Sequence, residues 1–261
     1  MSSDTLTKDG LIDAMETILG ENALETIDPV EVSQPAPSKA VKLEPPLCFT
    51  QNDLPVALQS IHSQNGVSEI VVGLLEKVPR WKPGSVIKWA AWSDGYHCKD
   101  DADHAAKQLA IAAEQWNEAN VGVTFEWVQH SRDATFVLVY GGSKGGVLAS
   151  AFFPNGSDLN FVYVFGGAFR HGWKENMWKV FTHELGHVLG LRHEFAIEKE
   201  KMGATQLGPQ NEFSVMNYRA EPPELQKSDI ESTREFYAIR ADDYGNPAKV
   251  GSRYIEDFIP S

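Results

Sequence analysis

The chain has 261 residues, enough for one or two domains with a sizeable core, and its 42% hydrophobic and 23% charged residues are typical of a globular protein. The formal charge of −13 at pH 7 disfavours nucleic acid and anionic membrane surfaces as partners, and no apolar run approaches the length of a membrane-spanning helix. Two cysteines, Cys48 and Cys98, are too few for a disulfide framework.

The N-terminal part of the chain predicts one helix and one linker. Residues 1–27 are acidic and predict an amphipathic helical segment. Four apolar residues share one side of this helix: Leu11, Met15, Ile18 and Leu19. Residues 28–47 contain five prolines within DPVEVSQPAPSKAVKLEPP and predict an extended linker. The first 20 residues lack the basic start and apolar core of a secretory signal, so we expect a cytoplasmic protein, with unconventional secretion or a secreted chain trimmed of its leader as alternatives.

From Trp81 onward, the pattern alternates between strands and helices. Candidate strands, rich in β-branched and aromatic residues, cover residues 85–92, 122–128, 134–140, 147–153 and 160–165. A helix is predicted over 103–120, and five of its residues share one apolar face: Ala106, Leu109, Ala110, Ala113 and Trp116. A last helix is expected to open at Ser228, with Glu231 at capping-box spacing.

The stretch THELGHVLGLRHEF, which begins at position 182, holds three of the eight histidines. His183 and His187 are four residues apart and leave the same side of a helix, and Glu184 lies about 100° further round. Gly190 can adopt the positive φ that follows a helix end, so the chain can turn and bring His193 back toward the first two histidines. Three converging imidazoles leave a tetrahedral ion one open position, as a catalytic zinc requires.

The apolar residues around this stretch support the same geometry. Five of them lie on the side of the helix opposite the histidines: Trp178, Phe181, Leu185, Val188 and Leu189. One face would therefore pack into the core while the other presents ligands. The alternative is a purely structural role for the histidines, but an ordinary amphipathic helix has no need of histidine, glutamate and histidine on its polar side.

The eleven residues HELGHVLGLRH resemble the extended zinc signature of the metzincin metallopeptidases, which also carry a methionine turn downstream. FSVMNYR follows, with Met216 23 residues after His193. The resemblance implies that His183, His187 and His193 bind one zinc ion above a hydrophobic floor formed by Met216. It covers roughly residues 81–240, the expected catalytic domain, and implies the metzincin α+β fold: a twisted, mostly parallel sheet with two main helices, the active-site helix, and a C-terminal helix after the methionine turn.

Features of more than one metzincin subfamily are present. Glu194 directly after the third histidine and Tyr218 two residues after the methionine are similar to astacins, whereas GGVLASAFFP is similar to the matrixin segment ahead of the active-site helix. The subfamily therefore stays open. Matrixins hold a second, structural zinc and calcium around that segment, but Ser150 stands where a histidine would be needed, so we expect neither extra metal.

The resemblance implies a zinc-dependent endopeptidase with protein or peptide substrates. Glu184 would act as general base on a zinc-bound water with a pKa of about 7, and would then protonate the leaving amine. Tyr218 would ligate zinc or stabilise the transition state. An edge strand would pair with an extended substrate through four residues: Leu148, Ala149, Ser150 and Ala151.

The segments that flank the expected catalytic domain have less specific patterns. Residues 48–80 would be a pro-segment or an N-terminal extension, and residues 241–261 a C-terminal tail. Cys48 could act as a latency ligand on the zinc, as the matrixin propeptide cysteine does, could pair with Cys98, or could stay a buried free thiol. The residues around it, PPLCFTQND, lack the flanking residues of the matrixin switch.

Two other functions stay open. A catalytically inactive metzincin-like binding module would keep a structural zinc, but such a module has no use for Glu184, whose presence favours an enzyme. A zinc hydrolase that acts on another kind of bond fits the histidine spacing equally well. The order of the elements and the methionine turn favour a peptidase over it.

Overall fold

The centre of the molecule is a five-stranded sheet. The structure is a computed structural model that describes residues 7–20, 24–29, 77–194, 205, 207, 211–217, 219, 222–242 and 246–261. The strands of this sheet are β2 (Val86–Ala91), β3 (Thr124–Trp127), β4 (Phe136–Tyr140), β5 (Ala149–Ser150) and β6 (Asn160–Val164). They lie in the order β3-β2-β4-β6-β5, with every neighbouring pair parallel except β5 and β6. The predicted α+β fold with a mostly parallel sheet is confirmed.

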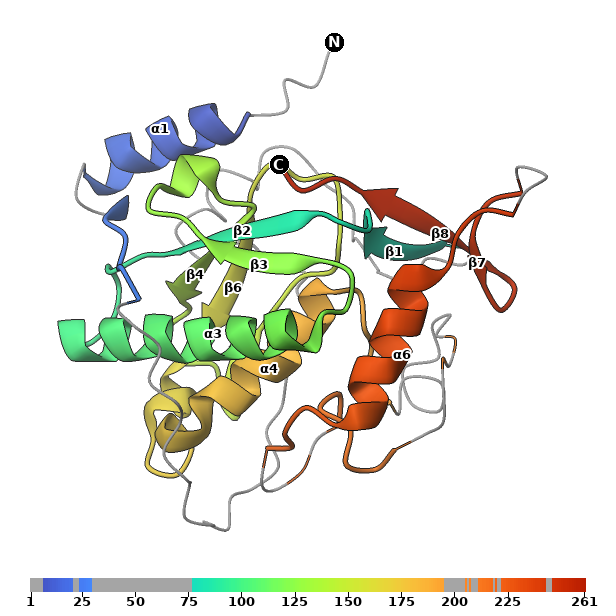
Figure 1. Ribbon diagram of the computed structural model, residues 1–261. Helices are drawn as coiled ribbons and strands as arrows, with labels where there is room; N and C mark the ends of the chain where they lie inside the picture. Colours follow the sequence, from blue (N-terminus) through green and yellow to red (C-terminus); the bar gives the residue numbers. More distant parts are fainter. Residues whose placement is uncertain are drawn as a thin grey trace.

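Both faces of this sheet are covered. The side chains of β4 alternate, so that Phe136 and Leu138 enter a larger core while Val137 and Val139 enter a smaller one. The larger core is closed by α3 (Lys99–Ala119) and α4 (Met177–Val188), which pack against each other, and α1 (Lys8–Leu19) lies over the opposite face (Figure 1). The five residues predicted to form the apolar face of the α3 region are all buried. None of the helices in the described part of the chain is long and apolar enough to cross a membrane.

α1 contacts the smaller core through a narrow stripe. Ile12 and Met15 are buried, whereas Ile18 and Leu19, predicted on the same side, are 59% and 46% exposed. The helix contributes buried residues to the smaller core only from its middle, and its last turn extends beyond that contact. The acidic side of α1 is held by Arg132, whose guanidinium bridges Asp9 and Asp13.

A second sheet has the strand order β1-β8-β7 and consists of β1 (Lys77–Trp81), β7 (Lys249–Val250) and β8 (Arg253–Phe258). β1 and β8 are parallel and pair from Lys77 with Tyr254 to Trp81 with Phe258. The stretch 241–261, predicted as a tail, thus contributes two strands. The division of the chain into domains stays a prediction, but residues on both sides of the expected 81–240 domain share this sheet.

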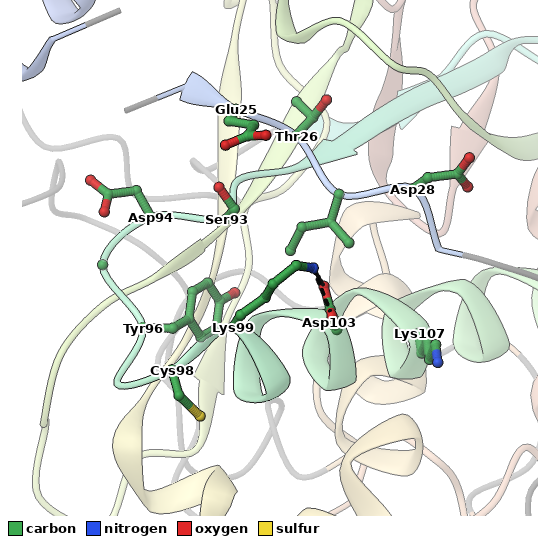
Figure 2. A pocket seen from close by; sticks show the side chains of 12 residues that line it. Glu25, Thr26, Asp28, Ser93, Asp94, Tyr96, Cys98, Lys99, Asp103 and Lys107 are labelled. Carbon is green, nitrogen blue, oxygen red and sulfur yellow. Dashed lines mark hydrogen bonds and ion pairs between the residues drawn. The ribbon is translucent and has the colours of Figure 1, made fainter. Parts of the chain in front are cut away.

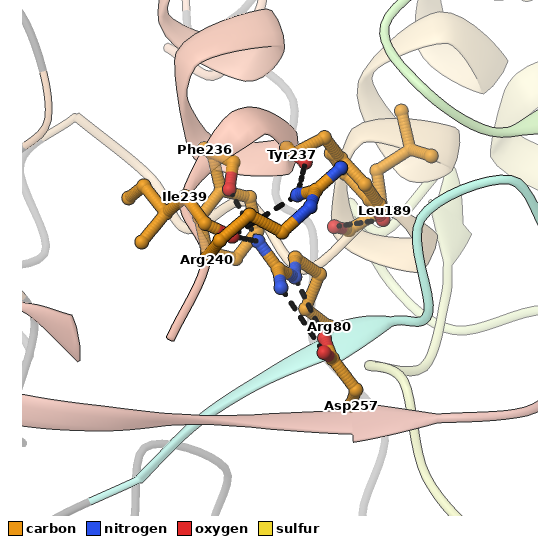
Figure 3. A network of polar contacts seen from close by, with 7 residues as sticks. All are labelled: Arg80, Leu189, Phe236, Tyr237, Ile239, Arg240 and Asp257. Atoms are coloured by element: carbon orange, nitrogen blue, oxygen red, sulfur yellow. Dashed lines mark hydrogen bonds and ion pairs between the residues drawn. The ribbon is translucent and has the colours of Figure 1, made fainter. Parts of the chain in front are cut away.

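Arg80 ties the second sheet to α6 (Lys227–Ala238) and is almost completely buried. Its Nε and Nη2 donate to the two carboxylate oxygens of Asp257 at 2.8 and 3.1 Å (Figure 3). Its Nη1 donates to the carbonyl oxygens of Phe236 at 2.6 Å and Ile239 at 3.2 Å. These carbonyls lie at the C-terminal end of α6, where the helix itself offers no donors. The buried Arg80 guanidinium therefore joins β1 and β8 to the C-terminal end of α6.

The N-terminal end of α6 differs from the prediction. Gln226 is the N-cap, and the carboxylate of Asp229 accepts a hydrogen bond from its backbone N–H at 2.9 Å. The predicted capping pair of Ser228 and Glu231 is wrong, because Ser228 already lies within the first turn, where its hydroxyl accepts from the side chain of Asn211. The N-cap is thus two residues earlier than predicted, and the Asp229 carboxylate that completes the capping box is buried.

Candidate metal centre

Three histidine side chains meet beside α4. His183 and His187 leave this helix one turn apart, and His193 follows it in the chain. One nitrogen from each of the three rings can be chosen so that all lie within 4.8 Å of one another, and all three residues are buried. The Nε2 atoms of His187 and His193 are 3.2 Å apart. The convergence that the spacing predicts is therefore present in the fold.

The end of α4 sets the turn that brings His193 back. The N–H of Gly190 donates to the carbonyl oxygen of His187 at 2.8 Å, and the N–H of Leu191 donates to that of Gly186 at 2.9 Å. This is the Schellman pattern, and Gly190 has the φ of +93° that the pattern needs. A Cβ atom at this position would also lie 2.6 Å from the carbonyl oxygen of Pro79. Glycine is required here for both reasons.

Two side chains from other elements satisfy the last carbonyls of α4. The indole Nε1 of Trp81 donates to the carbonyl oxygen of Val188 at 2.8 Å. The hydroxyl of Tyr237 donates to that of Leu189 at 3.0 Å (Figure 3). The second sheet and α6 thus hold the end of the helix that carries the histidines.

Main-chain carbonyls orient two of the imidazoles. Nδ1 of His183 lies 2.7 Å from the carbonyl oxygen of Val215, and Nδ1 of His187 lies 2.8 Å from that of Leu191. Because a carbonyl oxygen only accepts, each Nδ1 must carry the proton, which leaves the Nε2 lone pair for a metal. A set of neutral nitrogen donors with one tetrahedral position left over suits zinc, so the residues fit the metal.

The electrostatics of the cluster keep these rings neutral. Burial, with the nearby His193, lowers the pKa of His183 to about 3. Burial lowers the pKa of His187 well below its usual value in the same way. Both rings are uncharged at pH 7, the form in which histidine binds metal. Glu184, the residue after His183, is buried as well.

Met216 packs against α4 at Gly186, which precedes His187 in the sequence. A Cβ atom on Gly186 would collide with the sulfur of Met216, so glycine at this position allows the close approach. The backbone of Met216 is held as well, since its N–H donates to the hydroxyl of Ser214 and its carbonyl oxygen accepts from Glu194 N–H at 3.3 Å. The methionine turn therefore contacts both the helix and the residue next to His193.

Asp229 is a residue that sequence reasoning missed. Its Oδ2 accepts from the N–H of Val215 at 2.8 Å, and the carbonyl of Val215 is the group that orients His183. Burial raises the pKa of the Asp229 carboxyl. Its sequence signal is an acid in the first turn of the predicted last helix, which the capping box expected at Ser228 and Glu231 does not include.

Comparison with known proteins agrees with the histidine geometry. A family model described as metallo-peptidase family M12 matches residues 94–229, which is more than half of the chain. The chain belongs to metallopeptidase family M12. Among solved structures, it is similar to high choriolytic enzyme 1 (HCE-1), a hatching enzyme zinc-protease from Oryzias latipes (Medaka fish), with a TM-score of 0.41 and 15% identity over 60% of this chain and 94% of that chain. No curated protein matches the chain.

The metzincin resemblance of the sequence is thus confirmed. The matched range of the M12 metallopeptidase model includes the three histidines, Glu184 and Met216. It begins in the loop before α3 and ends in the first turn of α6, so it leaves out the second sheet, α1 and strand β2 of the main sheet.

The expected substrate strand of this metallopeptidase lies at the edge of the main sheet. β5 is antiparallel to β6, is the last strand of the order and contacts α4. It is shorter than the predicted 147–153, and the side chains of the four residues expected to bind substrate, Leu148, Ala149, Ser150 and Ala151, are buried. Any pairing with substrate would therefore use main-chain groups, and the role of these residues stays a prediction.

Two residues expected near the zinc lie outside the described part of the M12 metallopeptidase: Tyr218 and Cys48. Their predicted roles stay predictions. Cys98, the suggested pairing partner of Cys48, is an exposed free cysteine at the N-cap of α3.

A cavity of about 550 Å³ lies elsewhere in the metallopeptidase, between residues 25–28, the 93–98 loop and the start of α3 (Figure 2). Lys99 and Asp103 form an ion pair at its edge at 2.8 Å. The cavity shares no residue with the histidine cluster, and its lining carries charges of both signs. It is separate from the candidate metal centre.

Proposed function

We propose that the chain is a zinc-dependent endopeptidase. His183, His187 and His193 would hold one zinc ion, and Glu184 would serve as the general base. The observation that carries the proposal is the set of three buried imidazoles with Nδ1 atoms fixed by main-chain carbonyls and a buried carboxylate next in sequence. Membership of a metallopeptidase family gives the class of substrate, proteins or peptides.

The chemistry divides between the metal and the side chains. When bound, zinc supplies a Lewis acid that polarises the peptide carbonyl and makes water more acidic. Glu184 would take a proton from the attacking water and pass it to the leaving nitrogen, which needs a carboxylate that is ionised at the start and held close. Tyr218 would donate a hydrogen bond to the developing oxyanion.

The substrate would lie in an extended form along the edge of the main sheet. β5 has β6 as its neighbour on one side and ends the strand order on the other. Main-chain pairing with residues 148–151 would hold a peptide without selecting its side chains.

The first test is the metal content of the purified chain and its cleavage of casein with and without a zinc chelator. One zinc per chain and cleavage that the chelator abolishes would support the proposal. One zinc without cleavage would favour the inactive binding module, in which the metal serves structure alone.

The Glu184→Gln variant separates catalysis from metal binding. It should keep one zinc and the fold but lose about 10²–10⁴-fold in turnover, because an amide cannot accept the proton. His187→Ala should lose the metal itself. Glu175→Gln, an exposed change just before α4, is the matched control and should cleave as the unaltered chain does. Full activity of Glu184→Gln would contradict the assignment of the base.

A further inference from the structure

A lysine lies on the histidine side of α4. Lys179 precedes His183 by four residues, so the two side chains share one side of the helix. Only 4% of the Lys179 side chain is exposed. Four residues correspond to about 6 Å of rise along a helix, which puts the base of Lys179 one turn from the candidate metal centre.

The ammonium group of Lys179 is paired with a carboxylate from another segment. Its Nζ is 2.9 Å from Oε1 of Glu224, which lies in the described stretch between Met216 and α6. The same Nζ is 5.4 Å from the ring of Trp178. Glu224 is 61% exposed, so a buried cation is joined to a carboxylate at the surface.

The free-energy cost of losing this contact differs between Lys179 and Glu224. A buried ammonium group is costly unless a carboxylate stays beside it. An exposed glutamate regains its water when it leaves such a contact, so little is lost if another carboxylate replaces it. Lys179 therefore keeps its charge while its surface partner can be exchanged.

A bound peptide brings candidate carboxylates within reach. An extended chain rises about 3.3 Å per residue, so the residues that flank a cleaved bond lie within about 7 Å of it. This distance is comparable to the rise of about 6 Å along α4 between His183 and Lys179. The overall charge of −13 opposes acidic peptides at long range, so attraction must come from a local cation.

We infer that Lys179 selects substrates with an aspartate or glutamate beside the cleaved bond, by exchanging Glu224 for the substrate carboxylate. This inference rests on the proposed peptidase function and adds the class of substrate. Lys179 is then a specificity-determining residue. Its ion pair with Glu224 is the arrangement in the absence of substrate.

The test maps cleavage sites of the zinc-loaded full chain in a proteome-derived peptide library by mass spectrometry. We expect aspartate and glutamate to be enriched about 10-fold over asparagine and glutamine at one position next to the cut. Lys179→Met should lose this enrichment, Lys179→Arg should keep it, and Glu224→Gln should keep it because the ammonium group remains. Lys174→Met is the matched control, since it breaks a similar ion pair with Asp101 just before α4.

Binding provides a second readout that needs no turnover. The Glu184→Gln chain, with and without Lys179→Met, would be titrated against two casein-derived peptides that differ only in glutamate versus glutamine. We expect about 10-fold tighter binding of the glutamate peptide, and equal binding after Lys179→Met.

The outcomes separate this inference from the proposed function. Cleavage without acidic preference, or a preference that survives Lys179→Met, overturns the role of Lys179 alone. Loss of the preference in Glu224→Gln overturns it as well, because the pair would then shape the site without binding substrate. Absence of any cleavage by the zinc-loaded chain overturns the proposed peptidase and this inference with it.

Discussion

Gly190 controls the position of His193 through its backbone alone. Its φ of +93° costs a residue with a Cβ atom about 1–2 kcal/mol, and the carbonyl oxygen of Pro79 lies where that Cβ atom would be. The turn and the close packing of β1 are therefore two separate constraints on one position.

The Gly190→Ala variant should lose at least about 2 kcal/mol of unfolding free energy and bind zinc more weakly, because the turn must shift. Urea unfolding and zinc titration measure the two effects. Gly84→Ala is the matched control: Gly84 has a φ of +87° with nothing near its Cβ position, so only the backbone cost of about 1 kcal/mol applies. Equal losses for both variants would show that the contact with Pro79 is unimportant.

Asp229 acts on the metal site through the backbone of one residue, Val215. Asp229→Ala should weaken zinc binding about 10–100-fold, because Val215 loses the acceptor that fixes the carbonyl facing His183. Asp229→Asn should be milder, since the amide oxygen still accepts. Competition with a chromophoric chelator measures the affinity, and Glu231→Ala on the exposed side of α6 is the control. Unchanged affinity in Asp229→Ala would refute the link.

At the scale of elements, local patterns predicted most of the site. The four-residue spacing of His183 and His187 and the glycine at 190 place the three imidazoles together because helix periodicity and one turn are both local properties. The β1–β8 pairing had no such signal, since it joins residues 177 positions apart. The contact of Lys179 with Glu224 has no local signal for the same reason, because Glu224 comes from a distant segment.

The pairing of Arg80 with Asp257 should be a strong contributor to stability. Asp257→Ala would leave a buried guanidinium without its carboxylate and should cost about 3 kcal/mol. Lys77→Ala removes an exposed pair with Glu256 between the same two strands and should cost less than about 1 kcal/mol. Urea unfolding measures the loss of unfolding free energy in both variants. Similar losses would contradict the idea that burial makes the Arg80–Asp257 pair the stronger one.

At the scale of the whole molecule, the buried histidines make stability depend on pH. Burial lowers the pKa values of His183, His187 and His104, so the unfolded chain binds protons that the folded chain does not. The unfolding free energy of the metal-free chain should therefore fall as pH falls from about 6.5 to 5, by up to about 1.4 kcal/mol per pH unit for each such histidine.

Urea midpoints of the metal-free chain at pH 7.5, 6.5, 5.8 and 5.0 measure this dependence. His183→Gln should have a shallower slope, because it removes one of the groups concerned. Midpoints that stay constant down to pH 5 would mean that these rings are not held neutral by burial.

The parallel pairing of β1 with β8 also sets an order of events while the protein is made. At about 5–20 residues per second, roughly 9–35 s separate the synthesis of Arg80 from that of Asp257. During this interval β1, which contains Trp81, lacks its partner β8, although the Trp81 indole is one of the donors at the end of α4. An interrupted chain that lacks β8 cannot complete this support, so only a polypeptide elongated past Asp257 assembles the full frame around its histidines.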